Sequence, residues 1–323
     1  MVFSKMIKIN LLKASIKAFL PKFLFYKKKH KSIAIIGTRR GATTYLQGLF
    51  IDNTTRSIDQ PFEHFPRKYW SRTVNFKKKQ IPSRDLNQLF DFEDNDINHL
   101  KTYLKYFENG KYAFIDQNFG FSKNRIVYKF TEGSYFIDQF SELKIFPIII
   151  FRHPIGQAFS CMRNKWGHIY YPYMNSSFFI REFLDTPNKI NLFLNIDKFG
   201  TELEKRILDW YCSNAYLLKV YQNYVTLFYE NLVLDPITEI KKIPKEYMEY
   251  VDLNKLNKPS GSSYLSENDF KSKIGDKGYK KKHLAKPFQK LSSLEKRKID
   301  RIFAILEIKI YNAFDASLNL TNN

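Results

Sequence analysis

The chain has 323 residues, of which 44% are hydrophobic and 17% aromatic, with 12 glycines and 12 prolines. This composition supplies ample apolar material for a packed core, which excludes a disordered or fibrous chain, and the length fits one large α/β domain or two small ones. The 53 Lys and Arg residues exceed the 32 Asp and Glu residues by 21, which fits either a polyanionic partner or a general bias toward Lys, Asn, Ile, Phe and Tyr. Two cysteines, Cys161 and Cys212, are too few for a disulfide framework and lack metal-binding spacing, so we expect a reducing compartment and no structural zinc, with one bridge left open.

Residues 1–31 are predicted to form a basic N-terminal arm, and residues 32–323 the α/β domain. The arm has nine lysines and no carboxylate, the first acidic residue of the chain being Asp52. Lysine interrupts the apolar residues about every four positions, so the arm offers neither a secretory signal nor a membrane span. We therefore expect a cytoplasmic protein with no signal peptide or transmembrane helix, whose arm is either solvated or in peripheral contact with an anionic membrane.

From Ser32 onward, compact apolar runs alternate with helical patterns. The predicted strands are 32–37, 125–130, 145–151 and 225–229. The predicted helices are 44–50, 155–166, 201–222 and 292–314. This alternation predicts a single domain with a parallel β-sheet flanked by helices. The stretches 52–110 and 167–199 have weak periodicity, so we expect them to be insertions that cover the carboxyl edge of the sheet, where α/β proteins bind ligands.

The first predicted strand ends in the turn Gly37-Thr-Arg-Arg-Gly-Ala-Thr-Thr44. Backbone N–H groups and a helix N-terminus at such a turn attract anions, and two arginines add positive charge. Against the triphosphatase pattern GxxxxGK[ST], Ala42 stands for the second glycine and Thr43 for the lysine that reaches the terminal phosphates. A nucleoside triphosphatase is therefore disfavoured.

A second candidate anion site follows the predicted strand 145–151, where Arg152-His-Pro leads into a helix and Ser160 comes eight residues after Arg152. An arginine at the carboxyl end of a strand offers a bidentate fork to a phosphate monoester, and a hydroxyl about two turns into the next helix can reach the same anion. His153 lies between the arginine and a proline, so we expect it to be a turn residue.

These two elements resemble the 5′-phosphosulfate loop and the 3′-phosphate motif of the sulfotransferases that use 3′-phosphoadenosine 5′-phosphosulfate (PAPS). The resemblance spans about residues 32–310 and implies a P-loop-like sulfotransferase fold with PAPS as sulfuryl donor and no metal. Within the loop, Arg39, Gly41 and Ala42 replace the proline, serine and glycine of the usual family pattern. A Gly-rich basic segment at 272–280 resembles the family's loop over the 3′-phosphate. The implied cofactor-binding residues are Arg39, Arg40, Gly41, Ala42, Thr43, Thr44, Arg152, Ser160, Lys277 and Gly278.

The resemblance also implies catalytic residues. Arg40 would stabilise charge on the leaving 5′-phosphate, and Lys129 is similar in position to the lysine that many members keep beside the cleft. Cytosolic members have a histidine soon after that lysine, and this chain lacks it. The segment 60–65 resembles the one in which heparan-type glycan members carry a glutamate. The candidates for the general base are therefore, in this order, Glu63, His64 and Glu132.

The glycan-type resemblance and the aromatic insertions favour a carbohydrate acceptor, a glycan or glycolipid sulfated on a hydroxyl or amine. A small phenol, an amine and a lipid-linked glycan stay open as acceptors, and a nucleic-acid partner is disfavoured. Two other functions remain as alternatives. One is a nucleotide kinase with an eroded phosphate loop, against which Thr43 argues. The other is a catalytically inactive basic protein that binds nucleic acid or membrane, for which Ala42 is the main argument.

Overall fold

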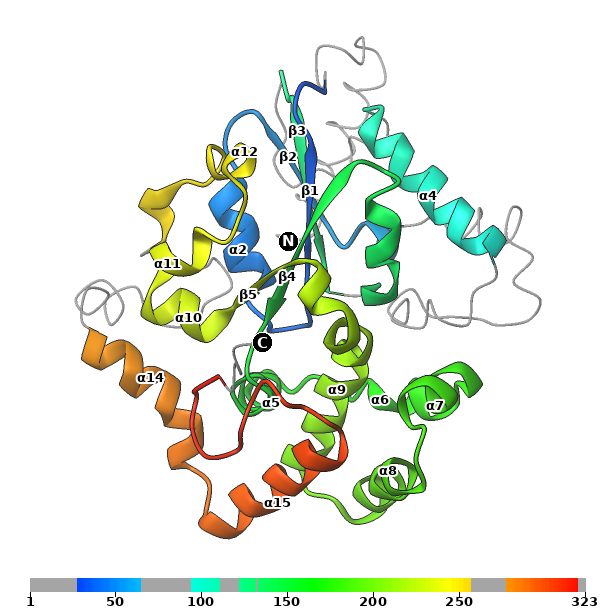
Figure 1. Ribbon diagram of the computed structural model, residues 1–323, viewed down its shortest axis with the longest axis vertical. Coiled ribbons are helices and arrows are strands. Elements are labelled where there is room, and N and C mark those ends of the chain that lie inside the picture. The colour runs from blue at the N-terminus through cyan, green and yellow to red at the C-terminus, as the bar shows by residue number, and fades with distance from the viewer. Residues whose placement is uncertain (1–27, 65–93, 111–121, 132, 257–276, 319–323) are drawn as a thin grey trace, which may run out of the picture.

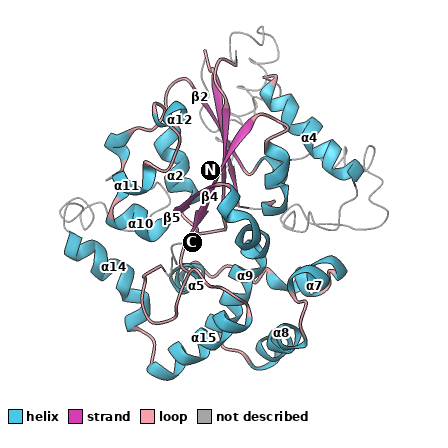
Figure 2. Cartoon of the chain, in the orientation of Figure 1, coloured by secondary structure: helices cyan, strands magenta, loops and turns pink. Residues whose placement is uncertain are grey.

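The computed structural model describes residues 28–64, 94–110, 122–131, 133–256 and 277–318. Five strands in these ranges form one parallel sheet in the order β2-β3-β1-β4-β5, with helices on both of its faces (Figures 1 and 2). The prediction of a parallel α/β fold is confirmed. The strands are β1 Ser32–Ile36, β2 Thr55–Asp59, β3 Arg125–Phe130, β4 Ile145–Phe151 and β5 Val225–Phe228.

The central strand β1 shows why the sheet needs cover on both faces. All five of its residues are buried. Because successive side chains of a strand point to opposite faces, Ile33 and Ile35 belong to one hydrophobic cluster, and Ala34 and Ile36 belong to another. An apolar run of this kind, buried on both sides, is typical of a parallel sheet.

The cluster around Ile33 and Ile35 is closed by helices from two parts of the chain. These are α2 (Thr43–Phe50), which directly follows β1, and the segment after β5 with α10 (Tyr229–Leu234), α11 (Pro236–Ile240) and α12 (Lys245–Met248). In Figure 1 these helices lie together on the left of the sheet. The loop between β1 and α2 therefore leaves the carboxyl edge toward this face.

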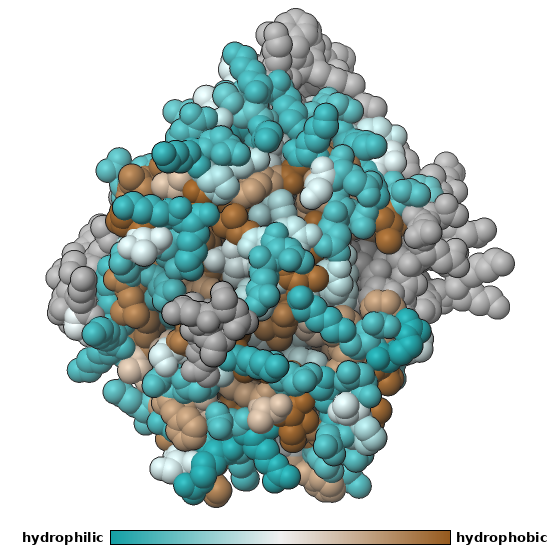
Figure 3. Space-filling view, in the orientation of Figure 1, coloured by the Kyte–Doolittle hydropathy of each residue, from teal (hydrophilic) through white to brown (hydrophobic). Residues whose placement is uncertain are grey.

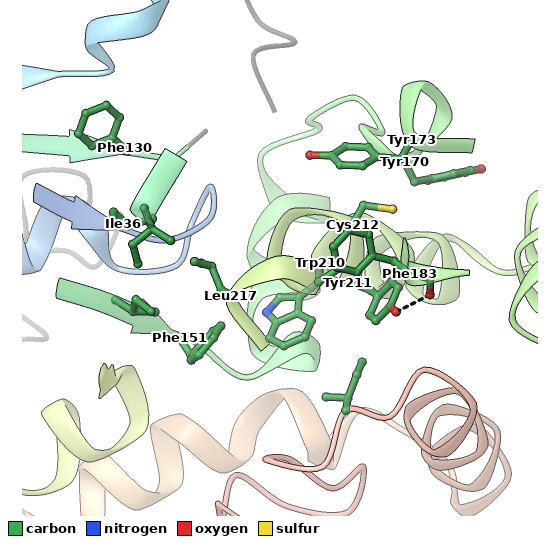
Figure 4. Packing of buried hydrophobic residues seen from close by; sticks show 14 of the residues in the cluster. Ile36, Phe130, Phe151, Tyr170, Tyr173, Phe183, Trp210, Tyr211, Cys212 and Leu217 are labelled. Atoms are coloured by element: carbon green, nitrogen blue, oxygen red, sulfur yellow. Dashed lines mark hydrogen bonds between the residues drawn. The ribbon is translucent and has the colours of Figure 1, made fainter. Parts of the chain in front are cut away.

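The other cluster is larger and is rich in aromatic side chains (Figure 4). It includes residues of α4 (Asp94–Glu108), the 3-10 helix η5 (Ser134–Phe140), α5 (Pro154–Arg163), α9 (Glu202–Val220) and α15 (Ser293–Ile305). Within it the buried hydroxyl of Tyr211 donates to the carbonyl of Phe183 at 2.9 Å, so the ring is buried with its polar end satisfied. Cys161 and Cys212 are both buried and free.

Part of the first insertion predicted at the carboxyl edge lies elsewhere. The stretch 52–110 holds the edge strand β2 and helix α4, and Glu108 at the end of α4 accepts hydrogen bonds from Ser32, the first residue of β1 (2.9 Å), and from Tyr128 (2.6 Å). The expectation was therefore wrong for α4, which packs beside the face of the sheet and ends near the amino end of β1. The stretch 167–199 forms α6 (Tyr170–Met174), α7 (Ser177–Phe183) and α8 (Pro187–Phe199), and α6 and α8 pack against α9.

The last predicted helix is also shorter than expected, since α15 ends at Ile305 and not at Phe314. Glu307 has φ 56°, a left-handed conformation that an α-helix cannot continue through. Beyond it, Ile308, Ile310, Tyr311 and Ala313 are all buried. The C-terminal segment therefore packs into the core as an irregular chain.

Residues 1–27 of the predicted basic arm lie outside the described residues. At its end, Lys28 is paired with Glu108, and the hydroxyl of Tyr250 lies 2.9 Å from Nδ1 of His30. Among the helices that are described, none combines the length and apolar character needed to cross a bilayer. The face of the molecule in Figure 3 is mostly hydrophilic, with scattered apolar residues.

Candidate anion-binding site

The loop between β1 and α2 is tightly folded at the carboxyl edge of the sheet. The N–H of Gly37 donates to the carbonyl of Phe130 (3.0 Å), and the N–H of Gly41 donates to the carbonyl of Thr38 (2.8 Å). A Cβ atom at Gly37 would lie 2.7 Å from the carbonyl oxygen of Ile150, and one at Gly41 would lie 2.7 Å from that of Thr38. Both positions therefore require glycine because of close backbone approach.

Helix α2 begins at this loop without a capping side chain. Its N-cap residue, Ala42, has φ 74° and ψ 13° and makes no side-chain cap hydrogen bond. The backbone of Arg40 is also in the left-handed region, with φ 60°. The first N–H groups of a helix have no partner within the helix, and serine, threonine or aspartate usually satisfies one of them. An alanine cap leaves this end of α2 suited to an external anion.

The two predicted phosphate elements lie in contact. Because β1 and β4 are neighbouring parallel strands, the segments that follow them meet at one edge. Arg40 donates from Nε to Oγ of Ser160 in α5 at 2.9 Å, and Arg152 donates from Nη1 to the carbonyl of Arg40 at 3.0 Å. Ser160 is buried, and the guanidinium of Arg152 lies 4.5 Å from the ring centroid of Tyr229. The structure therefore brings Arg40, Arg152 and Ser160 together.

Gln157 ties the loop to α5. Its Oε1 accepts a hydrogen bond from the hydroxyl of Thr38 (2.9 Å), and its Nε2 donates to the carbonyl of Arg39 (2.6 Å). Gln157 was not among the residues predicted for the site. A carboxamide can accept and donate at once, whereas a guanidinium can only donate. Arg39 itself lies over the ring of Trp166, 5.4 Å from its centroid.

His153 has a structural role, as predicted for a turn residue. The N–H of Ile155 donates to its Nδ1 (3.2 Å), so the ring proton is on Nε2, which donates to the carbonyl of Asn312 (2.8 Å). Burial lowers the pKa of His153 to about 3. The backbone N–H of His153 donates to Oε1 of Glu230 at 3.0 Å, and burial raises the pKa of that carboxyl to about 7. His153 is therefore neutral and caps α5, which fixes the backbone next to Arg152.

Lys129, at the end of β3, contacts the start of α2. Its Nζ lies 3.1 Å from Oγ1 of Thr44 and 2.6 Å from Oδ2 of Asp59, at the end of β2. Because Asp59 and Lys129 are register partners on adjacent strands, the ion pair forms across the carboxyl edge. Asp59 was missed in the sequence because its strand, Thr55-Arg-Ser-Ile-Asp, contains one aliphatic residue and no hydrophobic alternation.

The predicted bases are only partly described. Glu63 and His64 belong to the 3-10 helix η2 (Pro61–His64), whose backbone begins two residues after Asp59, and their side chains lie outside the description. Phe62 in the same turn is packed in the core against Phe130, at a centroid distance of 5.1 Å. Glu132 lies outside the described residues.

The basic segment near the C-terminus is helical from Lys277 onward. Lys277 and Gly278 are the first residues of α14 (Lys277–Gln289), and the side chain of Lys277 is not described. This helix packs against α5 and α10 at the lower left of Figure 1. The predicted loop is therefore, in its described part, the first turn of a helix next to the Arg152 turn.

Fold and geometry together define an α/β protein with a parallel sheet and a candidate anion site, rich in arginine, at its carboxyl edge. Among the described residues, no cluster of His, Cys, Asp and Glu suited to a metal ion occurs. No family model matches the chain, and no curated protein matches it. Among solved structures, the chain is similar to the sulfotransferase domain of the olefin synthase from Synechococcus PCC 7002, with 16% identity and a TM-score of 0.44 over 88% of this chain and 97% of that one. This similarity is distant.

Proposed function

We propose that the protein is a PAPS-dependent sulfotransferase that moves a sulfuryl group to a hydroxyl or amine of a carbohydrate acceptor, a glycan or glycolipid. The contact between Arg40 and Ser160 at 2.9 Å carries this proposal, because it unites the loop suited to a 5′-phosphate with the element suited to a 3′-phosphate. A nucleotide with both phosphates matches such a pair of adjacent anion sites. The acceptor class rests on the segment around Glu63, and peripheral membrane contact of the basic arm remains a prediction.

The residues of the site fit the chemistry of the donor. PAPS, when bound, supplies a sulfuryl group whose leaving group is a phosphate. Arg40 and the N–H groups at the start of α2 would bind that phosphate, and Arg152 and Ser160 the 3′-phosphate. Lys129 beside Thr44 adds a positive charge at the same helix end. Such preorganised donors stabilise negative charge that develops on a leaving group.

A base must take the proton of the acceptor hydroxyl while the new O–S bond forms and the bond from sulfur to the 5′-phosphate oxygen breaks. Glu63 is our first candidate, since its backbone position follows β2 at the carboxyl edge. Asp59 is a further candidate, because its carboxylate is already held 2.6 Å from Lys129 at that edge. Both positions belong to β2 or to the segment that follows it, and β2 pairs with the strand that carries Lys129.

Calorimetry with 3′-phosphoadenosine 5′-phosphate (PAP), AMP, ATP and random DNA at about 150 mM salt tests the proposal, since nonspecific DNA binding weakens steeply with salt. We expect PAP to bind far more tightly than AMP or ATP. Arg152→Ala should weaken PAP binding by at least about 2 kcal/mol, the scale for removing one partner of a buried charged hydrogen bond. Ser160→Ala should weaken it by about 1 kcal/mol, as a neutral contact.

Arg181→Ala is the matched control, because Arg181 is exposed on α7 and pairs with its neighbour Glu182. This variant should bind PAP like the wild type. Equal affinity for PAP and AMP, or wild-type binding by both site variants, would refute the proposed function. Tighter binding of ATP than of PAP would favour the kinase alternative.

A further inference from the structure

Helices α14 and α15 carry a large share of the protein's positive charge. From Lys277 to Ile305 the chain has ten lysine and arginine residues and two acidic residues, a net charge of +8 out of +21 for the whole sequence. The two carboxylates hold the local backbone. Glu295 accepts hydrogen bonds from the N–H and the hydroxyl of Ser292 (2.8 and 2.7 Å), and Asp300 accepts one from the N–H of Ala313 (3.4 Å).

Six exposed cations line the outer faces of these two helices. On α14 they recur every four residues, and on α15 they are spaced so that they share one face. The opposite face of α15 is buried, with Ile299, Ile302 and Phe303 in the core. Within the described ranges, none of the six forms an ion pair. We call them the basic patch: Lys282, Lys286 and Lys290 in α14 and directly after it, and Arg297, Lys298 and Arg301 in α15.

An apolar side chain lies on the same face as the cations of α15. Leu294 precedes Lys298 by four residues and Arg301 by seven, which places the three on one side of the helix. Leu294 is 57% exposed. The basic patch therefore combines positive charge with an apolar side chain that no part of the described chain covers.

Helix α8 continues this combination beside α15. The two helices pack together, and Nζ of Lys189 in α8 lies 2.7 Å from Oε2 of Glu307 just after α15. The outer side of α8 exposes Leu194 at 53%, and its last residue, Phe199, at 74%. Nζ of Lys198 lies 5.0 Å from the ring centroid of Phe199. In Figure 1, α8, α14 and α15 form the lower end of the molecule, and in Figure 3 strongly hydrophilic side chains gather there with apolar ones between them.

We propose that the basic patch, with Leu294 and the exposed apolar side chains of α8, docks the protein on a bilayer that contains anionic lipids. Such a bilayer offers negative head groups to the cations and an apolar layer directly beneath them. The phosphates of a nucleic acid would satisfy the cations but would leave Leu294 and Phe199 against polar groups. The inference goes beyond the proposed function and does not depend on it.

Cosedimentation of the full chain with vesicles at about 150 mM salt tests the inference, because at this ionic strength charges more than about 8 Å from the membrane are largely screened. We expect the wild type to bind phosphatidylcholine vesicles that contain about 30% phosphatidylserine, and to bind phosphatidylcholine alone weakly. Each cation in contact with the surface should strengthen binding about fivefold. The triple variant Arg297→Gln, Lys298→Gln, Arg301→Gln should therefore bind at least about 25-fold more weakly, the loss of two such contacts.

The matched control is the triple variant Lys105→Gln, Lys241→Gln, Lys245→Gln. It removes the same net charge from exposed positions on α4, directly after α11 and on α12, which lie above α14 and α15 in Figure 1. Its binding to the anionic vesicles should fall by less than about threefold, because these charges would lie beyond the screening distance.

Leu294→Ser tests the apolar part of the surface separately. It should weaken vesicle binding about fivefold, since less apolar surface is buried, and leave binding to a DNA duplex unchanged. Equal losses in the two triple variants, or tighter binding of the wild type to DNA than to the anionic vesicles, would overturn the inference. If the first triple variant does not fold, wild-type vesicle binding by Leu294→Ser would overturn it. The preference for PAP over AMP bears only on the proposed function, so the two can fail separately.

Discussion

Replacing Ala42 by glycine tests the geometry of the loop between β1 and α2. Ala42 has φ 74°, and a non-glycine residue in the left-handed region costs about 1–2 kcal/mol. Glycine removes this strain but adds about 0.4–1 kcal/mol of chain entropy to the unfolded state. We therefore expect Ala42→Gly to raise the free energy of unfolding by about 0.5–1 kcal/mol, or the melting temperature by about 1–3 °C.

The same change removes a methyl group next to the amides that start α2. We expect PAP affinity to increase about fivefold, the value of one additional hydrogen bond. Ser122→Gly is the matched control, because Ser122 is exposed and also left-handed, with φ 58°. It should stabilise the protein without changing PAP affinity. A loss of about 1 kcal/mol in Ala42→Gly, as for glycine within a helix, would show that the cap residue is not left-handed.

Two further predictions concern carboxyl groups. Glu63→Gln should lower turnover by about 10²–10⁴-fold, the range for removing a positioned base. The variant should keep its PAP affinity and lose the rise of activity with pH. If only Asp59→Asn abolishes turnover while the enzyme stays folded, the base is Asp59 and the glycan-type assignment of Glu63 is wrong. Burial raises the pKa of Glu230 from 4.5 to about 7, so the folded state holds a proton that the unfolded state releases, and stability from this group falls as the pH rises from 4.5 to 7. The free energy of unfolding of Glu230→Gln should therefore rise relative to that of the wild type across this window, by up to about 1.4 kcal/mol per pH unit. Urea unfolding of both proteins at pH 5 and 8 measures this difference, and the titration of His153 cancels because it occurs in both. A difference that does not depend on pH would contradict this account.

The parts of the fold that could be predicted from the sequence are those in which one kind of interaction dominates. Strands β3 and β4 begin and end where predicted, since their apolar runs are buried on both faces. Strand β2 could not be found, because Arg56 is buried within it and donates to the carbonyl of Phe107 at 2.8 Å. A partner 51 residues away decides its conformation, and no local pattern records that partner.

The candidate site divides in the same way. Arg40, Arg152 and Ser160 were found because they follow predictable strands at fixed spacing. The contacts of Gln157 could not be foreseen, since they depend on the loop that packs beside α5. The irregular C-terminal segment was predicted as helix because its apolar residues allow that pattern, and the left-handed Glu307 is visible only in the structure.

The contact between His153 and the carbonyl of Asn312 has a consequence for biosynthesis. The turn that presents Arg152 is completed by a residue 159 positions later, and Tyr311 packs against the same imidazole at a centroid distance of 4.6 Å. While the ribosome is still translating α15, the nascent sheet and the loop between β1 and α2 can form, but the buried histidine lacks the acceptor for its ring proton. A messenger truncated before the codon for Ile308 would therefore yield a polypeptide with the five described strands and an incomplete Arg152 turn. Under the proposed function, the Arg152 turn is therefore the part of the nucleotide site that is completed last.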